Sequence, residues 1–543
     1  MAEVAELLRR YKKAKALREP WIKLVKKAFA YARPNWRLEY QEYGDYESYP
    51  TEDITSVYDG TAMKALDGFV SNLQSSLVPP VQEWIQLAGG FGMASEQKRQ
   101  NDPILKKITE TMFDCLSVSN FDTEMAKSFA DFSAGVGTLK LDKGTKDDPF
   151  HFAAIPSCEM YLEEGPKGRV DSNFRRHMVA YENILATWDD AKLPADWQEK
   201  INSGAGQDKV ALIESMRPCK MKKGIGDLEE EIDGYCYTVM AESGDIRLLE
   251  REQESSPWII FRWPGMPGEV YPQGPLLKAL PDIRSINKVK ELLLKRASRD
   301  TFGLYTYLED SVINVENIRF GEMSFIPVDS NGGARGPSIA ALPSTGDLNV
   351  SQFLFKDMQT SINETLFSEP MGPVDAPVKT ATEIASRLAA LAKKIGSAFG
   401  QLQYELLKVL VARMLYILDE LGLIDLGGFR VDGRVININY QTPLAKAQDE
   451  EDFMASERYA QTCVNTYGTE VGLAMAPPDK FAPYWAQKLH VPTELLPTVD
   501  EVAAMKQVAA QMAAKQMQAN QPPPQTGAAE GGPDSGAPMA VAA

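Results

Sequence analysis

Apolar positions recur at helical spacing most clearly between residues 274 and 422 of the chain. A first helix is predicted over 276–302, where apolar side chains return every three or four residues. A second helix is predicted over 349–366, beginning at Asn349, a residue type that favours the N-cap position. Between the two, apolar residues interleave with Gly and Pro, as in short strands joined by turns. The pattern therefore predicts two long helices joined by a compact β-like insert.

A proline-rich segment follows the second helix and excludes helical structure over 370–377. Thr380 and Glu383 then form a capping box, which satisfies two backbone donors at the start of a third helix. Apolar residues continue at helical spacing up to Gly422, a residue type favoured just after a helix ends. A straight helix of that length would span about 60 Å. The long helix contains two glycines at which we expect it to bend, Gly396 and Gly400.

The first 274 residues mix helical and strand patterns, which predicts an α+β region with a mostly antiparallel sheet. An N-terminal helix is expected over 1–35, with a break at Pro20. Further helices are predicted over 53–78, 96–117, 121–135, 182–188 and 207–216. Strands are predicted over 84–87, 138–143, 150–155, 159–165, 175–181, 236–242, 246–252 and 258–263.

The chain after residue 422 is predicted to be mostly helical. A strand is expected over 429–439, and residues 519–543 are expected to be disordered, because Pro, Gly, Ala and Gln there bury too little apolar surface to offset chain entropy. The helices are predicted over 445–465, 468–476, 481–489 and 500–518. The fold class is therefore α+β and predominantly helical.

At 543 residues the chain exceeds what one hydrophobic core supports, so about two to four structural regions are expected. No apolar run reaches the roughly 18 residues that a membrane helix needs, and the charged N-terminal residues lack a signal-peptide core. The formal net charge is −17. A simple nucleic-acid clamp would be basic, whereas an acidic protein lets a polyanion pass without capturing it.

The five cysteines and three histidines lie singly along the chain. No pair has the spacing of a metal or redox motif, so we expect reduced thiols and structural histidines. No phosphate-binding, metalloprotease or nucleophile-elbow motif is present. The acidic run Glu229, Glu230 and Glu231 is interpreted as a solvated loop, because consecutive carboxylates cannot all converge on one ion. We therefore expect no cofactor, no metal site and no catalytic residue.

The two helices of the central stretch differ in charge. Lys and Arg predominate on the first, and Asp and Glu predominate on the second. In an antiparallel pair such helices attract each other, within one chain or between subunits. Taken singly, the charges are more typical of a solvated surface. A further interpretation is that the basic helix tunes a surface that DNA meets.

Several stretches, taken together and in order, resemble the portal proteins of short-tailed bacteriophages, also called head-to-tail connectors. The resemblance covers roughly residues 5–518. It includes a helix closed by two prolines, a helix-to-strand passage, the start of the family's stem and its long wing helix. The stretches read EPWIKLVKKAFAYARPNW, GTAMKALDGFVSNLQSSLVPPVQEWIQL, DFSAGVGTLKLDK, WIIFRWPGMPGEVYPQGPLLKALPDIRSINKVKELLLK and TATEIASRLAALAKKIGSAFGQLQYELLKVLVARML.

The resemblance implies a portal fold, assembled as a homododecameric ring around an axial channel. Each subunit would then contain named regions in a defined order. They are a wing (1–274), a first stem helix (275–302), a clip (303–346), a second stem helix (347–367), a tunnel loop (368–379), a long wing helix with the strand after it (380–440), a crown (441–518) and a disordered C-terminal tail (519–543).

Three groups of site residues follow from the same resemblance. The tunnel loop would point into the DNA channel, and its members are Ser368, Glu369, Pro370, Met371, Gly372, Pro373, Val374, Asp375, Ala376, Pro377, Val378 and Lys379. Candidates for transient DNA contacts on the first stem helix are Lys288, Lys290 and Lys295. Candidates for docking the terminase and tail proteins on the clip are Arg319, Glu322 and Arg335.

The implied function is a conduit at one capsid vertex. The terminase packages double-stranded DNA through it, the DNA is later ejected through it, and the tail attaches to it. The implied partners are the terminase large subunit, tail adaptor and tail tube proteins, and the major capsid and scaffolding proteins, with no membrane. The protein would be assembled in the host cytoplasm and located in the virion. It would not be an enzyme, because ATP hydrolysis belongs to the terminase.

Two alternatives remain open from the residues alone. One is a cytosolic α+β enzyme of unidentified activity, which the absence of a catalytic motif disfavours. The other is a different virion ring, such as an adaptor, although adaptor chains are usually much smaller. A ring with a central hole, seen in an electron micrograph, would favour the portal, whereas a monomer or dimer would favour the enzyme.

Overall fold

The computed structural model describes the chain in segments. They are residues 2–34, 56–80, 82–89, 95–165, 168–225, 228–244, 246–302, 304–308, 324–328, 339–341, 348–368, 396, 398–425, 436–440 and 443–489. The chain divides into two compact units, Met1–Gln448 and Asp449–Ala543, and each is described by itself.

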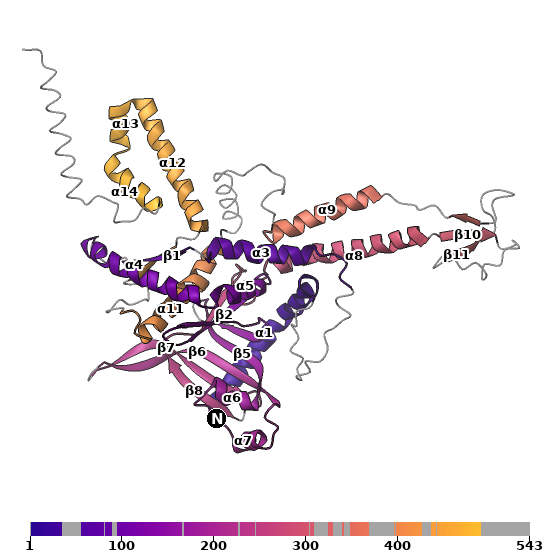
Figure 1. Cartoon of the computed structure of the whole chain (residues 1–543), viewed down its shortest axis with the longest axis horizontal. Coiled ribbons are helices and arrows are strands. Elements are labelled where there is room, and N and C mark those ends of the chain that lie inside the picture. Colours follow the sequence, from indigo (N-terminus) through magenta and orange to yellow (C-terminus); the bar gives the residue numbers. More distant parts are fainter. Residues whose placement is uncertain are drawn as a thin grey trace, which may run out of the picture. The chain divides into compact units, whose positions relative to one another are not determined.

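Helices occur in every part of the described chain (Figure 1). Their bounds are α1 (Ala2–Ala32), α3 (Thr61–Leu77), α4 (Ser95–Val118), α5 (Phe121–Phe132), α6 (Tyr181–Thr187), α7 (Ala195–Asn202), α8 (Pro275–Phe302), α9 (Leu348–Thr365), α11 (Lys408–Glu420), α12 (Pro443–Tyr467), α13 (Thr469–Met475) and α14 (Pro478–Lys488). The last three match the helices predicted over 445–465, 468–476 and 481–489.

Among the described residues, the strands form a five-stranded sheet, two three-stranded sheets and a two-stranded ribbon. The five-stranded sheet is an antiparallel meander of β4 (Met160–Glu164), β5 (Val170–Ala180), β6 (Lys209–Ile225), β7 (Leu228–Ala241) and β8 (Arg247–Gln253). A second sheet has the order β3-β2-β9, from β3 (Phe150–Ala154), β2 (Val136–Lys143) and β9 (Trp258–Arg262). The third consists of β11 (Ser324–Val328), β10 (Leu304–Leu308) and β12 (Ile339–Ala341), and the ribbon pairs β1 (Ile85–Gly89) with β13 (Ile436–Tyr440).

These elements confirm the predicted α+β class. The predicted helices over 276–302 and 349–366 correspond to α8 and α9 within about one residue at each end. Each strand predicted over 84–87, 138–143, 150–155, 159–165 and 175–181 has a counterpart in β1 to β5. The helix expected over 500–518 and the tail over 519–543 lie outside the described residues.

The helix predicted over 207–216 is wrong, because residues 209–216 form the first half of β6. β6 lies in the middle of its sheet, between β5 and β7, and residues 212–216 are all buried. A strand buried on both faces shows no alternation of apolar and polar residues, so its pattern resembles that of a buried helix. The short helix α7, just before it, was not predicted.

Two local predictions are also corrected. Pro20 does not break the N-terminal helix, because α1 continues through it. The chain on both sides is held by tertiary contacts, with the Trp21 indole N–H donating to the Pro272 carbonyl at 3.1 Å. The run Glu229–Glu231 is not a loop, because it lies in β7 and pairs in register with residues of β6.

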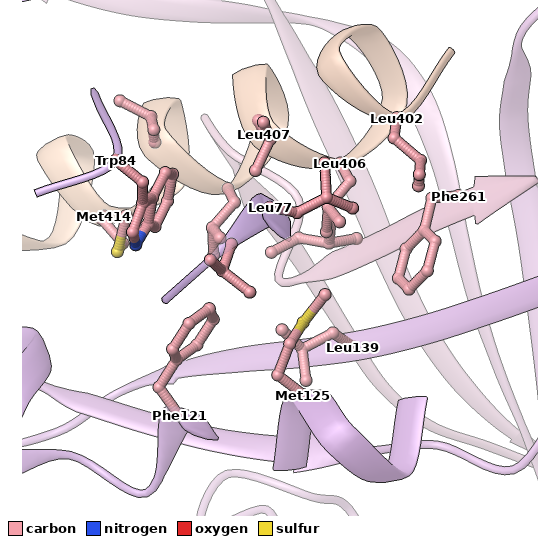
Figure 2. Close-up of a cluster of buried hydrophobic side chains, with 14 of the residues drawn as sticks. Leu77, Trp84, Phe121, Met125, Leu139, Phe261, Leu402, Leu406, Leu407 and Met414 are labelled. Atoms are coloured by element: carbon pink, nitrogen blue, oxygen red, sulfur yellow. The ribbon is translucent and has the colours of Figure 1, made fainter. Parts of the chain in front are cut away.

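A large hydrophobic cluster joins segments that lie far apart in the sequence. Leucines from the helix after residue 398, among them Leu402, Leu406 and Leu407, face side chains of α3, α5, β2 and β9 (Figure 2). Trp84, beside β1, and Phe261 of β9 belong to the same cluster and are fully buried. Burying each such side chain contributes about 1.5–3 kcal/mol. The cluster therefore fastens the described part of the predicted long helix to the N-terminal strands.

The helix after residue 398 is irregular at one turn. Gln403–Leu407 form a π-helical turn, a few residues beyond the predicted bend at Gly400. Within this turn the Glu405 carboxylate accepts hydrogen bonds from the Arg262 side chain and backbone amide, both at 2.9 Å. Both side chains are largely buried, so little water competes with the contact between them. The pair sets the register of this helix against β9.

The smaller unit is a helical cluster with an aromatic centre. The indole of Trp485 contacts Phe453 and Phe481 edge-on, and its N–H donates to Ser456 Oγ at 2.8 Å. The Phe481 ring also stacks on Tyr459. These contacts hold α14 against α12.

A buried polar network crosses the five-stranded sheet. The fully buried Glu214 carboxylate of β6 lies 3.3 Å from the Arg175 guanidinium and 3.3 Å from the His177 imidazole, and it accepts the Tyr237 hydroxyl. Burial alone raises the pKa of Glu214, but the charge of the Arg175 guanidinium, helped by Lys140 and by the hydrogen bond from Tyr237, outweighs burial, so the pKa is lowered. Burial lowers the pKa of His177 despite the nearby carboxylate. Folding therefore favours a charged Glu214 beside a neutral His177.

This network predicts a loss of stability in mild acid. Below about pH 6.5, His177 binds a proton more readily in the unfolded chain than in the folded one. The free energy of unfolding should therefore decrease as the pH is lowered. The His177→Gln substitution removes this titration. Between about pH 7.5 and pH 5.5, the variant should lose less unfolding free energy than the unmodified chain, as measured by chemical denaturation. Equal losses in both proteins would contradict the assignment.

Candidate functional site

Helices α8 and α9 form an antiparallel pair that leads from the five-stranded sheet toward β10 and β11 (Figure 1). The Ser361 hydroxyl donates to Asp282 Oδ2 at 2.7 Å near one end of the contact. Farther along α8, the Lys290 ammonium lies 5.4 Å from the centroid of the Phe355 ring. These are the two helices that the sequence predicted over 276–302 and 349–366. β10 directly follows the C-terminal end of α8.

The α8–α9 pair is buried at its base, which is the end formed by the start of α8 and the end of α9. Farther along the pair, its apolar side chains are exposed to solvent. At the base, Leu276, Ile283 and Ile286 of α8 and Ile362 and Leu366 of α9 are buried in a cluster with α1, α3 and the sheet strands. Farther out, large apolar side chains are exposed on both helices. They are Leu292 (55%), Leu294 (50%), Phe353 (74%) and Leu354 (45%). Grouped exposed apolar side chains of this kind mark an interaction surface.

Asn287 ties the segment before α3 to α8. Its amide oxygen accepts the backbone N–H groups of Tyr58 at 2.7 Å and Asp59 at 3.2 Å. Its amide nitrogen donates to the Ser56 carbonyl at 3.0 Å. Asn287 is buried, so the backbone groups that it pairs would otherwise have little access to water. One side chain thereby holds three residues of the preceding segment against α8.

Asp59 extends this junction to the start of α3. Its carboxylate accepts the backbone N–H of Thr61 at 2.9 Å and lies 3.2 Å from the Lys290 ammonium. The Thr61 hydroxyl in turn accepts a hydrogen bond from the Gln359 amide at 3.1 Å. The N-terminus of α3 is therefore joined to both α8 and α9.

The three lysines predicted to contact DNA differ in their surroundings. Lys290 is paired with the buried Asp59. Lys288 and Lys295 are exposed, and both bind Glu291, at 2.8 Å and 2.6 Å. Hydrogen bonds from these two lysines lower the pKa of Glu291 to about 2, so the carboxylate stays charged. Two exposed ammonium groups share one carboxylate, which leaves this side of α8 locally positive.

The end of α9 is held in an unusual conformation. Phe367 has a φ of 52°, in the left-handed region that non-glycine residues seldom adopt. Its ring stacks on Trp263, with centroids 6.0 Å apart, and its carbonyl accepts the Asn72 amide at 2.7 Å. Contacts from β9's end and from α3 thus compensate for the backbone strain.

α3 also lies close to Ser368, the residue after Phe367. A Cβ added to Gly68 would lie 2.8 Å from the Ser368 Cβ, so the glycine permits this close contact. Ser368 is the one predicted tunnel-loop residue that the structure describes. The others, from Glu369 to Lys379, lie outside the described residues, as do the clip candidates Arg319, Glu322 and Arg335.

Sequence reasoning missed the residues that build this junction. Asp59 lies just before the start of α3 at Thr61, and Asp is a residue type favoured at helix starts, which was a usable local signal. Asn287 lies four residues after Ile283 on the apolar face of α8, and a polar residue on a buried face was the second signal.

In the described part of the chain, no three His, Cys, Asp or Glu side chains are grouped so that they can hold a metal ion. All five cysteines are free thiols, and burial raises the pKa of the Cys158 thiol. Among the same residues, no helix combines the length and the apolar character that crossing a membrane requires.

An α+β body with a long helical pair and exposed apolar side chains is typical of a subunit within a larger assembly. Residues 4–496 match the family described as "Bacteriophage head to tail connecting protein", and the chain belongs to this family. The resemblance to bacteriophage head-to-tail connectors is therefore confirmed, and the family describes a component of the virion.

One curated relative spans nearly the same length. The "Probable portal protein" of Bordetella phage BPP-1 is 20% identical over 541 residues, which covers 95% of this chain and 94% of the relative. Among solved structures, a chain of "Virion of native gene transfer agent (GTA) particle" is 11% identical and covers 73% of this chain and 89% of its own length. Its TM-score of 0.31 is too low to support an argument about the fold.

The three hydrogen bonds of Asn287 predict that removal of its side chain lowers the stability of the fold. Asn287→Ala leaves two backbone donors and one acceptor unpaired, so we expect the free energy of unfolding to fall by about 1–3 kcal/mol. Lys288→Ala, one position along the same helix and exposed, should change it by less than about 0.5 kcal/mol. Urea denaturation of the unassembled chain measures both. Equal stability of the two variants would show that Asn287 does not hold the junction.

Proposed function

We propose that this chain is the portal protein of its phage. Copies of it form a ring, a homododecamer, around a channel at one capsid vertex. The terminase large subunit packages double-stranded DNA through the channel, and the DNA later leaves by the same route. Tail adaptor and tail tube proteins attach to the ring, and the major capsid and scaffolding proteins surround it. Family membership and the length shared with the BPP-1 relative support this proposal.

The observation that carries the ring is the exposure of Phe353, Leu292 and Leu294 on the α8–α9 pair. Leu292 and Leu294 are two positions apart, so they project from different sides of α8. A helical pair that is apolar on more than one side gains most from neighbours on both flanks. A closed ring of identical subunits supplies such neighbours to every copy without leaving a bare end.

The regions of the portal fold are then assigned as follows. α8 and α9 are the stem, the β10–β11–β12 sheet belongs to the clip, and the tunnel loop begins at Ser368. The strands and helices before residue 275, together with residues 380–440, are the wing, and the unit that contains α13 and α14 belongs to the crown.

The net charge of the protein suits a channel through which DNA passes rather than a site that binds DNA tightly. The net charge of −17 opposes lasting capture of DNA. Lys288 and Lys295, which are exposed, provide brief phosphate contacts, and partial neutralisation by Glu291 keeps these contacts weak. Lys290 is the weakest of the three candidates, because its ammonium is already paired with Asp59. The protein itself carries no catalytic centre in this proposal, and the terminase hydrolyses ATP.

The first test concerns ring assembly. Leu292→Glu and Phe353→Glu place a charge where the ring buries apolar surface, at a cost of at least about 1–3 kcal/mol for each interface. We expect the fraction of protein in rings to fall at least about tenfold, because 1.4 kcal/mol corresponds to a factor of ten. Native mass spectrometry and negative-stain microscopy measure this fraction.

The matched control is Leu185→Glu on α6, because Leu185 is 46% exposed but lies away from the α8–α9 pair. It should leave ring formation unchanged. Full assembly of both stem variants, or the absence of rings from the unmodified chain, would refute the proposal.

The second test concerns the loop after α9. Deletion of residues 370–377 should leave ring assembly intact, because the loop faces the channel rather than the subunit interface. It should reduce packaging or retention of DNA. Genome content per particle is measured after complementation of a phage that lacks the protein. Normal genome content would exclude a channel role for this loop.

A further inference from the structure

The β6–β7 hairpin reaches beyond the rest of its sheet (Figure 1). β5 pairs with β6 only as far as Met216, and β8 pairs with β7 only from Tyr235 onward. Residues 217–225 and 228–234 therefore form a two-stranded extension, here called the arm. Among the described residues, no other strand pairs with the outer edge of either strand of the arm.

The two strands of the arm carry opposite charges. The β6 strand contains Lys220, Lys222 and Lys223, and the β7 strand contains Glu229, Glu230, Glu231 and Asp233. The register pairs Lys220 with Asp233, Lys222 with Glu231 and Lys223 with Glu230. An ion pair of 3.3 Å joins Lys220 and Glu231, whose side chains are 74% and 61% exposed. The arm is thus basic along one edge and acidic along the other.

The backbone of both edges can accept another strand. Pro218 lies in β6 opposite Tyr235, and proline is tolerated in a strand where its nitrogen faces outward. Because this direction alternates along a strand, the backbone groups of Lys220 and Lys222 also face outward. In an antiparallel pair the opposite residues share this direction, so the groups of Asp233 and Glu231 face out on the other edge.

Charge allows one combination of edges and opposes the others. Two β6 edges would bring lysine beside lysine, and two β7 edges would bring carboxylate beside carboxylate. Like charges on neighbouring strands destabilise a sheet, and opposite charges stabilise it by about 0.2–1 kcal/mol for each pair. Charged edges guard against indiscriminate pairing. This particular arrangement leaves the β6 edge of one arm free to meet the β7 edge of another.

We propose that the arm is an interface between copies of this chain, in which the basic β6 edge of one copy adds to the acidic β7 edge of the next. The proposal rests on the ring put forward above. A contact between two different edges is head-to-tail, and such contacts close into rings when the rotation between copies permits. A two-stranded ribbon is also only marginally stable by itself. Pairing with a neighbouring copy at each edge would stabilise the arm as part of a larger sheet.

A charge swap tests the proposal without disturbing the arm itself. The swap variant combines Lys220→Glu, Lys222→Glu, Glu231→Lys and Asp233→Lys. Opposite charges remain across the arm, and the two edges of identical copies remain complementary. The swap variant should therefore form rings of the normal mass by itself. Beside an unmodified copy, however, every arm contact would join like charges.

Co-expression of the swap variant with the unmodified chain provides the readout. One of the two carries a mass tag, and native mass spectrometry counts each type in every ring. We expect mixed rings to be at least about tenfold rarer than in a control that combines tagged and untagged unmodified chains. Random mixing would overturn the arm interface while leaving the ring intact. Failure of the unmodified chain to form rings would instead refute the proposed function, and the arm interface with it.

A second experiment does not depend on the folding of the swap variant. Chains with Lys220→Cys and chains with Asp233→Cys, both in a Cys219→Ser background, are assembled together and treated with a short bismaleimide. Crosslinks between the two kinds of chain are expected, because the two edges meet. Rings built from the Lys220→Cys chain alone should give none at this position. Absence of crosslinks in the mixed rings would overturn the proposal.

Discussion

The base of the α8–α9 pair is the contact on which the rest of the structure depends. Apolar side chains of both helices enter the same buried cluster as α1, α3 and the sheet strands. Asn287 closes this cluster by satisfying three backbone groups of the segment before α3. Packing and hydrogen bonding therefore hold the pair at its base. Its other end keeps exposed apolar side chains that folding of a single chain does not cover.

α3 contacts α9 at two points. Thr61 accepts a hydrogen bond from Gln359 partway along α9, and Asn72 donates to the Phe367 carbonyl at its end. A shift of α9 along its axis would break both contacts. The strained Phe367 and the close approach of Gly68 to Ser368 lie at the same end. The direction in which the chain leaves α9 is thus set by a helix from a distant part of the sequence.

The predictions succeeded where local pattern and burial agree. α8 and α9 are each buried along one side at their base, so helical spacing revealed them. β2 and β3 were found from their strand patterns. β6 was mistaken for a helix over 207–216, because a central strand is buried on both faces. The run Glu229–Glu231 was interpreted as a loop because consecutive carboxylates favour solvent, whereas the structure places the run in β7, in register with residues of β6.

The sequence by itself determined most helices, most strands and membership of the family, because spacing, capping and turn residues act over a few positions. Only the tertiary structure decided which charged groups are engaged. Lys288 and Lys290 look alike in the sequence, yet one binds Glu291 on its own helix and the other binds Asp59, which is 231 residues away. A side chain's partner depends on which distant segments pack together, and that packing is a property of the whole fold.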